Sequence, residues 1–257
     1  MLQTDSHIIA ASLAETYIQG NKSICYIAEN NSEARLLSHE LSLYIDSDLI
    51  NYFPEREILP FDHFSSPESI IKDRFKILNK ENNSPNIVIT SSKNLFERYP
   101  SKSFFRSLQS FNIGESIALD KFKKILTDNH FLHTDKVDTI NKFSSRGGVL
   151  DIWPSIYQNP IRIEFFDEEI ESIRSFDPSS QLTITKINQF NLTTGSSLPL
   201  DDGGIKKFRD NWRDYFPNND ERVCDLFNDL NNKSLAEGYE IYLPLFFEET
   251  ESFNNLF

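Results

Sequence analysis

The stretch SSRGGVLDIWP, Ser144–Pro154, places an arginine and two adjacent glycines directly before an apolar, strand-like run. The whole chain has only 8 glycines in 257 residues, so a pair at one place calls for a structural reason. Adjacent glycines let a strand begin with a bulge or let another backbone approach closely. We therefore expect Gly147 and Gly148 to bend the chain and to present Arg146 at the edge of a sheet.

The residues after the glycine pair predict a mostly antiparallel sheet. Strand-like runs follow one another closely, at Val149–Trp153, Pro160–Phe166, Ile170–Phe176 and Leu182–Phe190. The polar Asp167-Glu168-Glu169 between the second and third runs predicts a hairpin. One helix, Asp120–Asn129, precedes the runs, so this part of the chain is expected to be a small α+β domain.

The run PIRIEFFD divides its side chains between two faces. Strict alternation puts one set on each face, namely Ile161, Ile163 and Phe165 against Arg162, Glu164 and Phe166. If the first set is the core, Phe166 lies on a polar face close to Arg162. An exposed aromatic beside an arginine is typical of protein-interface hot spots. The alternative stays open that Phe166 only covers the sheet edge or packs under a loop.

The first part of the chain predicts a parallel α/β domain. Apolar strands are expected at Ser23–Ala28, Leu49–Phe53 and Asn86–Thr90. Helices are expected at Asp5–Gln19, at Ser32–Tyr44 and from Ser66 (N-cap) and Pro67 (first helical residue) to about Lys80. Fully apolar strands separated by helices indicate a parallel sheet.

The pattern of predicted helices and strands changes twice along the chain, which predicts three parts. Residues 1–114 form the first part of the α/β domain, and residues 115–196 form the inserted α+β domain. Residues 197–257 form a return segment, with a helix near Ile205–Tyr215 and a buried aromatic stretch, YEIYLPLFF. The linker GSSLPLDDGG, Gly195–Gly204, contains four glycines and marks the second change.

Composition and charge exclude several classes of protein. The net charge of −13 argues against a protein whose main task is to grip nucleic-acid phosphates. The apolar runs are too short for a membrane span, and the N-terminus lacks the basic start of a signal peptide. Cys25 and Cys224 give neither a disulfide framework nor zinc spacing, so a reducing cytoplasm is expected.

Candidate catalytic and metal sites give weak signals. The segment before the first helix, Met1–Ile9, has neither the glycines nor the lysine of a phosphate-binding loop. His130 and His133 lack a second ligand cluster, and an acidic hairpin tip is more simply a solvated surface. The Pro54–Ser69 loop is either functional or packs its own aromatics over the sheet.

Five stretches closely resemble the N-terminal UvrB-homology module of the bacterial transcription-repair coupling factor family, Mfd. They are YFPEREILPFDHFSSPESIIKDRFKIL, SSRGGVLDIWP, IRIEFFDEEIESIRSFDPSSQ, FRDNWRDYF and GYEIYLPLFF. The middle part also resembles the excision-repair protein UvrB. The resemblance covers almost the whole chain in one order, although no single motif carries it.

The resemblance implies a degenerate helicase-like, parallel-sheet α/β domain that is interrupted by a small α+β domain. That small domain is the docking site for UvrA, and the family's UvrA-contacting pattern falls on Arg146, Arg162 and Phe166. The family's motor domains, which use ATP and magnesium, and its contacts with RNA polymerase and DNA lie beyond this chain. We therefore expect a cytoplasmic UvrA-recruiting module of nucleotide excision repair, with no cofactor, no membrane contact and no enzymatic activity of its own. The alternative is an ATP-dependent helicase or nuclease domain that binds DNA directly.

Overall fold

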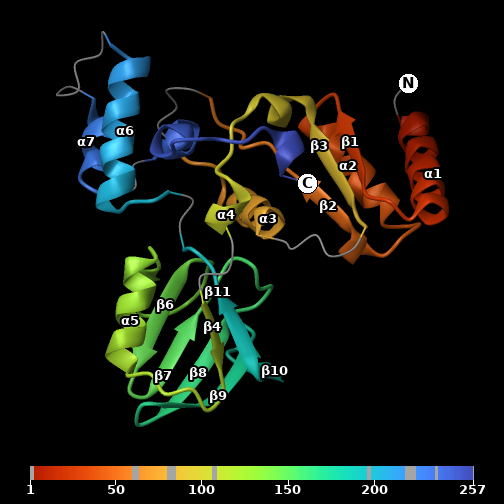
Figure 1. Ribbon diagram of the computed structural model, residues 1–257. Helices are drawn as coiled ribbons and strands as arrows, with labels where there is room; N and C mark the ends of the chain where they lie inside the picture. The colour runs from red at the N-terminus through yellow and green to blue at the C-terminus, as the bar shows by residue number, and fades with distance from the viewer. Residues whose placement is uncertain are drawn as a thin grey trace. The chain divides into compact units, whose positions relative to one another are not determined.

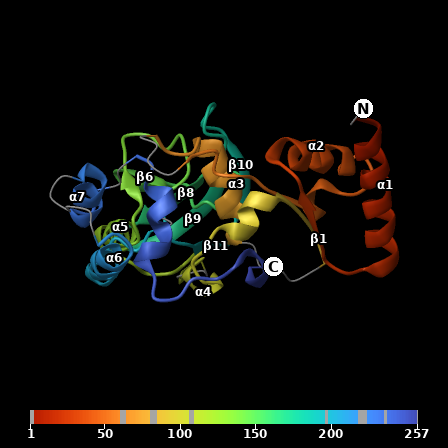
Figure 2. The same ribbon diagram turned by 90° about the horizontal axis from the view of Figure 1, so that it is seen from above.

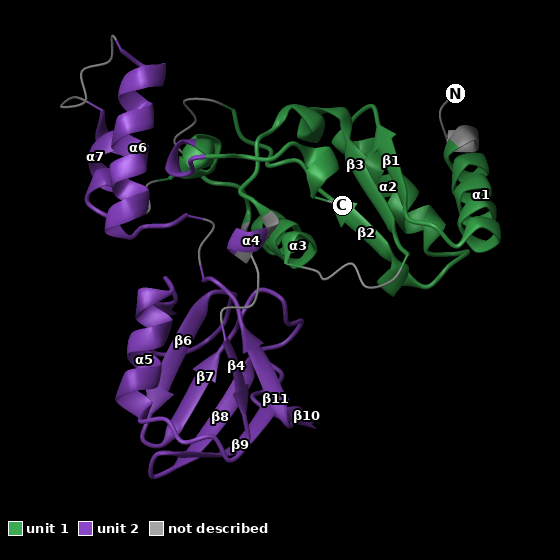
Figure 3. Cartoon of the chain, viewed as in Figure 1, with its two compact units in different colours: residues 1–101, 237–244, 249–257 green, residues 102–236, 245–248 purple. Residues whose placement is uncertain are grey.

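The computed structural model describes residues 3–59, 64–79, 85–105, 109–195, 198–217, 224–234 and 237–256 (Figure 1). The chain divides into two compact units (Figure 3). Unit 1 comprises Met1–Ser101, Glu237–Pro244 and Glu249–Phe257, and unit 2 comprises Lys102–Ala236 and Leu245–Glu248. The fold is therefore mixed, with a parallel sheet in one unit and antiparallel sheets in the other.

Unit 1 is built on a three-stranded parallel sheet in the order β1-β3-β2. The strands are β1 (Ile24–Ala28), β2 (Ile50–Phe53) and β3 (Ile87–Ser91). The described helical elements are α1 (Gln3–Gly20), α2 (Asn31–Leu41), η1 (Ser47–Leu49), α3 (Glu68–Leu78), η2 (Ser92–Phe96), η5 (Phe253–Asn255) and the part of η4 (Tyr239–Phe246) up to Pro244. The parallel α/β arrangement predicted for the start of the chain is thus present.

The central strand β3 separates two apolar clusters. On one face, Ile87 and Ile89 pack with residues of α1 and α2. On the other face, Val88 packs with Ile77 of α3 and with Phe253. Figure 2 shows α1 and α2 together on one side of this sheet. Every residue of β3 is buried, which explains why its apolar residues Ile87, Val88 and Ile89 follow one another without alternation.

The start of α3 differs from the prediction. Pro67, not Ser66, occupies the N-cap position, and it makes no side-chain capping bond. The Ser66 hydroxyl instead donates to the carbonyl of Arg56, 2.7 Å away, and its N–H donates to Glu240. Ser66 therefore ties the loop after β2 to η4, and this long-range role overrides its local preference for capping.

Unit 2 contains a six-stranded sheet in the order β10-β9-β8-β7-β6-β5 and a two-stranded sheet, β11-β4. The strands are β4 (Gln109–Asn112), β5 (Leu132–His133), β6 (Lys142–Arg146), β7 (Val149–Ile152), β8 (Ile161–Phe166), β9 (Glu169–Phe176), β10 (Thr183–Ile187) and β11 (Gln189–Leu192). Among the strand pairs described in unit 2, the β5–β6 pair is parallel and the others are antiparallel. The predicted hairpin at Asp167-Glu168-Glu169 joins β8 to β9, with Asp167 in the left-handed region.

Helix α5 (Leu119–Asp128) covers one face of the unit 2 sheet. Its Phe122 and Leu126 pack with the buried Ile161 and Ile163 of β8. The alternation read from PIRIEFFD therefore assigns the core face correctly. The other face of β8 carries Arg162, Glu164 and Phe166, which are half-buried or exposed.

One predicted strand is in fact two. The run Leu182–Phe190 divides into β10, which pairs with β9, and β11, which pairs with β4. Phe190 of β11 stacks on Phe111 of β4, with ring centroids 5.4 Å apart. Because β4 precedes Gly114 and pairs within unit 2, this unit begins earlier than residue 115.

The other helices described in unit 2 are α4 (Lys102–Phe105), α6 (Asp202–Tyr215) and α7 (Asp225–Asn231). Asp201 caps α6 by accepting the N–H of Gly204, so the helix begins three residues before its predicted start. In the described part of the chain, no helix is long and apolar enough to cross a membrane.

Candidate functional site

The Gly147–Gly148 pair forms a two-residue hairpin loop between β6 and β7, in which Arg146 pairs with Val149. Gly147 has a φ of +60°, which glycine adopts at little cost. At Gly148, a Cβ would lie 2.9 Å from the carbonyl oxygen of Phe165, closer than real contacts allow. The Phe165 N–H donates to the Gly148 carbonyl at 2.8 Å. One glycine therefore makes the turn and the other lets β8 approach, and Arg146 is left as the last residue of β6.

The strand register places the predicted residues on one face of the sheet. Side chains directly opposite one another across neighbouring strands share a face. One row reads Asp151, Arg162 and Arg174, and the next reads Arg146, Val149, Glu164 and Ser172. Phe166 pairs with Glu169 two residues further along β8. Arg146, Arg162 and Phe166 thus lie on the face that does not carry the core.

Arg162 is built into this face. Its Nε and Nη2 both donate to the carboxylate of Asp151 at 2.7 Å, and Nη2 also donates to Gln181 at 2.9 Å. The guanidinium lies over the ring of Phe176, 4.4 Å from the centroid. The bond to Asp151 raises the pKa of Arg162 above its usual value. The guanidinium is therefore fixed in orientation, and its Nη1 has no hydrogen-bond partner among the described residues.

A second charge pair lies beside the first. The Glu164 carboxylate accepts from the hydroxyl of Ser172 at 2.6 Å and from Arg174. The hydrogen bond from Ser172, followed by the hydrogen bond from Arg174, lowers the pKa of Glu164. Asp151, Glu164 and Arg174 were not singled out from the sequence. Strand parity placed Glu164 on this face, but only the cross-strand register shows which charges meet.

Arg146 and Phe166 are the exposed members of the predicted set. Phe166 is 74% exposed. Arg146 is exposed at the hairpin, and no ion pair or hydrogen bond of its side chain is present among the described residues. An aromatic ring and a cation are therefore presented to solvent on the same sheet face as an arginine that is already oriented.

The order of helices and strands shows that a phosphate-binding loop should be sought at a different place from the one considered in the sequence. The first parallel strand, β1, follows α1, so the relevant connection is Glu29–Asn30 before α2 and not Met1–Ile9. Asn30 accepts the Glu33 N–H, and the Glu33 carboxylate accepts the Glu29 N–H, both at 3.0 Å. A carboxylate of the chain itself thus lies at the N-terminus of α2, and the connection contains neither glycine nor lysine.

The other candidates from the sequence have structural surroundings of their own. The His133 ring packs against Phe143, with centroids 4.9 Å apart, and burial lowers the pKa of His130. Among the residues described, no group of three His, Cys, Asp or Glu side chains could hold a metal ion. Residues 60–63 of the predicted Pro54–Ser69 loop lie outside the described residues.

Comparisons with known proteins agree with the division seen in the fold. Residues 110–197 match a family described as the UvrB interaction domain. The transcription-repair-coupling factor of Haemophilus influenzae is 29% identical over 242 residues, which cover 93% of this chain and 21% of that protein. The Escherichia coli factor is 29% identical over 228 residues (88% and 20%), and the Rickettsia bellii factor is 27% identical over 252 residues (94% and 22%).

The chain spans about a fifth of the length of the curated relatives it matches. The match extends over both units, whereas the UvrB interaction domain lies within unit 2 and includes Arg146, Arg162 and Phe166. The resemblance expected from the sequence is thereby confirmed: this chain is similar over most of its length to the N-terminal part of transcription-repair-coupling factors, and residues 110–197 match the UvrB interaction domain.

Proposed function

We propose that this chain recruits UvrA through the face of unit 2 that carries Arg146, Arg162 and Phe166, and that it does so without an ATPase activity of its own. The observation that carries the proposal is the exposure of Phe166 on the same sheet face as one fixed and one exposed guanidinium group, within a match to the UvrB interaction domain. Buried aromatic and arginine anchors dominate the binding energy of protein interfaces.

The geometry suggests a different role in binding for each of the three side chains. Asp151 holds Arg162 in one orientation, so little side-chain entropy remains to be lost when a partner carboxylate meets Nη1. Arg146 would form its ion pair only in the complex, because it has no such partner in the described chain. Phe166 would supply the apolar centre from which water is excluded.

The test is a binding titration between the whole chain and purified UvrA. We expect Arg146→Glu and Phe166→Ala each to weaken binding by about tenfold or more, since losing a hot-spot side chain has effects of this size. The control is Glu168→Gln, at the exposed tip of the β8–β9 hairpin. If both variants are folded and bind UvrA as the parent does, the proposal is wrong.

Arg162 requires a different substitution. Arg162→Glu would place a carboxylate opposite Asp151 and would remove the cation from the Phe176 ring, so we expect it to destabilise unit 2. The Arg162→Lys variant keeps the charge but cannot reproduce the bidentate contact. Weaker binding by folded Arg162→Lys would support a role of the fixed guanidinium, whereas unchanged binding would restrict the site to Arg146 and Phe166.

A further inference from the structure

Strand β10 is the outermost strand of the six-stranded sheet of unit 2 and pairs with β9 (Figure 1). Among the described residues, no backbone hydrogen bond joins its outer edge to another segment. Four of its five residues are exposed, so both of its faces are open to solvent. Ile184 is 52% exposed, and Leu182, directly before the strand, is 70% exposed. An open edge of this kind is a template onto which another chain can add a strand.

The strand register places Lys186 of β10 at the end of a row of charges. Asp151 lies opposite Arg162, and Arg162 lies opposite Arg174. Arg174 in turn lies opposite Lys186. Like charges directly opposite one another destabilise a sheet. The two carboxylates of this face are used by the arginines, since Asp151 accepts from Arg162 and Glu164 accepts from Arg174.

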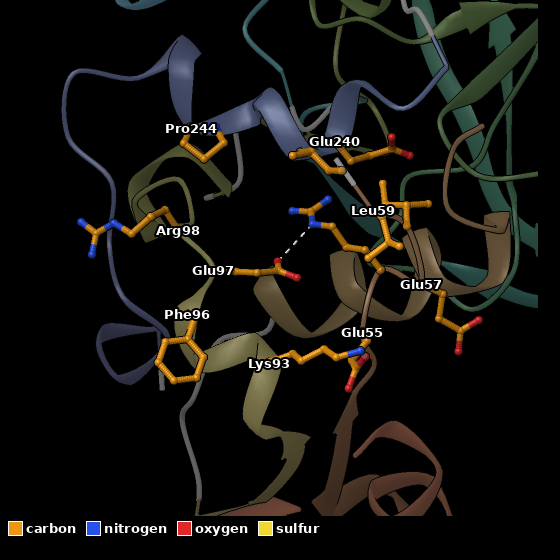
Figure 4. A pocket seen from close by; sticks show the side chains of 12 residues that line it. Glu55, Glu57, Leu59, Lys93, Phe96, Glu97, Arg98, Glu240 and Pro244 are labelled. Atoms are coloured by element: carbon orange, nitrogen blue, oxygen red, sulfur yellow. Dashed lines mark hydrogen bonds and ion pairs between the residues drawn. The ribbon is translucent and has the colours of Figure 1, made fainter. Parts of the chain in front are cut away.

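Lys186 is therefore a cation without a counterion. It is exposed, and it forms no ion pair with any described residue. The cations in the pocket of unit 1 differ in this respect. There, Arg56 donates to the Glu97 carboxylate at 3.1 Å, the contact drawn as a dashed line in Figure 4. Lys93 of the same pocket forms an ion pair with Glu55 at 3.1 Å. Their charges are matched within the chain, which leaves β10 as the stronger candidate for an acidic partner.

Strand β10 is continuous with the face proposed to recruit UvrA. Gln181, in the turn before β10, accepts a hydrogen bond from Nη2 of Arg162 at 2.9 Å. Lys186 shares the face of Arg162 and lies two strands away, which is about 10 Å in a sheet. A partner that contacts Arg162 can thus reach the edge of β10 without leaving this face.

A second copy of this chain is a poor match for β10. Residues 182–187 contain one charged residue, Lys186, and no carboxylate, so two paired β10 strands would offer each other no opposite charge. The register of β10 also shifts between Thr183 and Thr185, at a bulge. Bulges and lysines are features by which edge strands avoid pairing with strands like themselves. The edge instead favours a strand that carries acidic residues.

We propose, resting on the recruitment of UvrA argued above, that an acidic segment of UvrA adds to the sheet as a strand beside β10. Its backbone pairs with the outer edge of β10, one of its carboxylates binds Lys186, and its side chains cover Leu182 and Ile184. The main-chain hydrogen bonds supply affinity, and the ion pair fixes the register of the added strand. Lys186 is thus a binding residue in addition to Arg146, Arg162 and Phe166.

A charge reversal at the edge tests the ion pair, in a binding titration of the whole chain with purified UvrA. We expect Lys186→Glu to weaken binding about tenfold or more, because it replaces an attraction by a repulsion. The variant should stay folded, since its new carboxylate would lie opposite Arg174. Lys121→Glu is the matched control: it makes the same change of charge on α5, which covers the other face of the sheet, and it should bind UvrA as the parent does.

Hydrogen exchange tests the added strand itself. We expect the amides of β10 to gain protection when UvrA binds, while those of β11, which pairs with β4, stay unchanged. If UvrA binds the parent and Arg146→Glu weakens that binding, but Lys186→Glu binds as the parent does or β10 gains no protection, the added strand alone is wrong. A dimer of the free chain that protects β10 would also overturn it. If the parent does not bind UvrA at all, the recruitment proposal fails, and the added strand with it.

Discussion

A side chain at Gly148 would clash with its surroundings. Its neighbour Gly147 has space for a side chain, and glycine is favoured there only by the backbone conformation. A Cβ on Gly148 would lie 2.9 Å from the backbone oxygen of Phe165, while none of the surrounding atoms lies within 4 Å of a Cβ on Gly147. We expect Gly148→Ala to lower the free energy of unfolding by about 1–3 kcal/mol, the usual cost of overpacking. Gly147→Asn should cost less, because asparagine tolerates positive φ. Urea unfolding of the two variants checks this, and equal costs would contradict it.

Glu240 gives the protein a pH dependence whose sign is fixed by its burial. Burial raises the pKa of Glu240, so the folded state holds the proton more tightly than the unfolded state. Stability from this group is complete below the unfolded pKa and is lost as the pH rises towards the folded pKa. Because glutamine has no carboxyl group to titrate, we expect the Glu240→Gln variant not to lose this stability as the pH rises.

The free energies of unfolding of Glu240→Gln and the parent should therefore diverge with rising pH, the variant becoming relatively more stable from about pH 4 upward. Urea titrations at matched pH values measure this difference, in which the other titrating groups largely cancel. A difference that stays constant, or that shrinks as the pH rises, would contradict the prediction.

The two sides of β8 show what a sequence can reveal at the scale of single residues. Period-two alternation identified its buried and open faces, because that rule is local to the strand. The pairing of Arg162 with Asp151 could not be predicted in the same way. It depends on the register between β7 and β8, which are joined by residues 153–160 and not by a tight turn.

Helix α2 begins with the chain's own carboxylate in the position where nucleotide-binding folds hold a phosphate. Glu33 accepts a backbone N–H of the β1–α2 connection, and no lysine is present there to neutralise a polyanion. We expect isothermal calorimetry with ATP and magnesium to detect no stoichiometric micromolar binding. Glu33→Gln should not create such binding, since the glycines and the lysine are still missing. A saturable micromolar site in either protein would refute the prediction.

At the scale of elements, strand and helix positions were predictable to within a few residues, but their partners were not. The run Leu182–Phe190 has continuous strand character, and nothing in it indicates that β11 leaves the large sheet to pair with β4, about 80 residues earlier. Serine is a favoured N-cap residue, yet Ser66 donates hydrogen bonds to Arg56 and Glu240 and does not cap α3. Long-range contacts of this kind override local preference.

The charge of the whole chain limits its affinity for nucleic acid. Binding to duplex DNA depends on clustered cations that release counterions, and this chain has a net charge of −13. We expect fluorescence anisotropy with duplex DNA at about 150 mM salt to give no submicromolar binding. Tight binding that weakens steeply with added salt would contradict this expectation.

Residues far apart in the sequence complete the core of unit 1. Phe253 packs edge-on against Phe53 and Tyr99, with ring centroids 5.5 and 6.1 Å away, and Tyr99 pairs with Glu251 through two backbone hydrogen bonds. The segment 249–257 therefore belongs to the same core as β2 and β3, although residues 102–236 intervene. Stability of unit 1 should thus depend on the last residues of the chain.

We expect Phe253→Ala to destabilise unit 1 by about 3–5 kcal/mol, as for other large-to-small changes at fully buried aromatic positions. Phe96→Ala is the matched control, because Phe96 lies in the same unit but is 86% exposed, and it should change stability little. Hydrogen exchange resolved by residue distinguishes the units: amides of β2 and β3 should lose protection in Phe253→Ala, while those of β8 and β9 keep it. Equal loss in both units would mean that the two cores unfold as one, and unchanged protection of β2 and β3 would show that Phe253 does not support them.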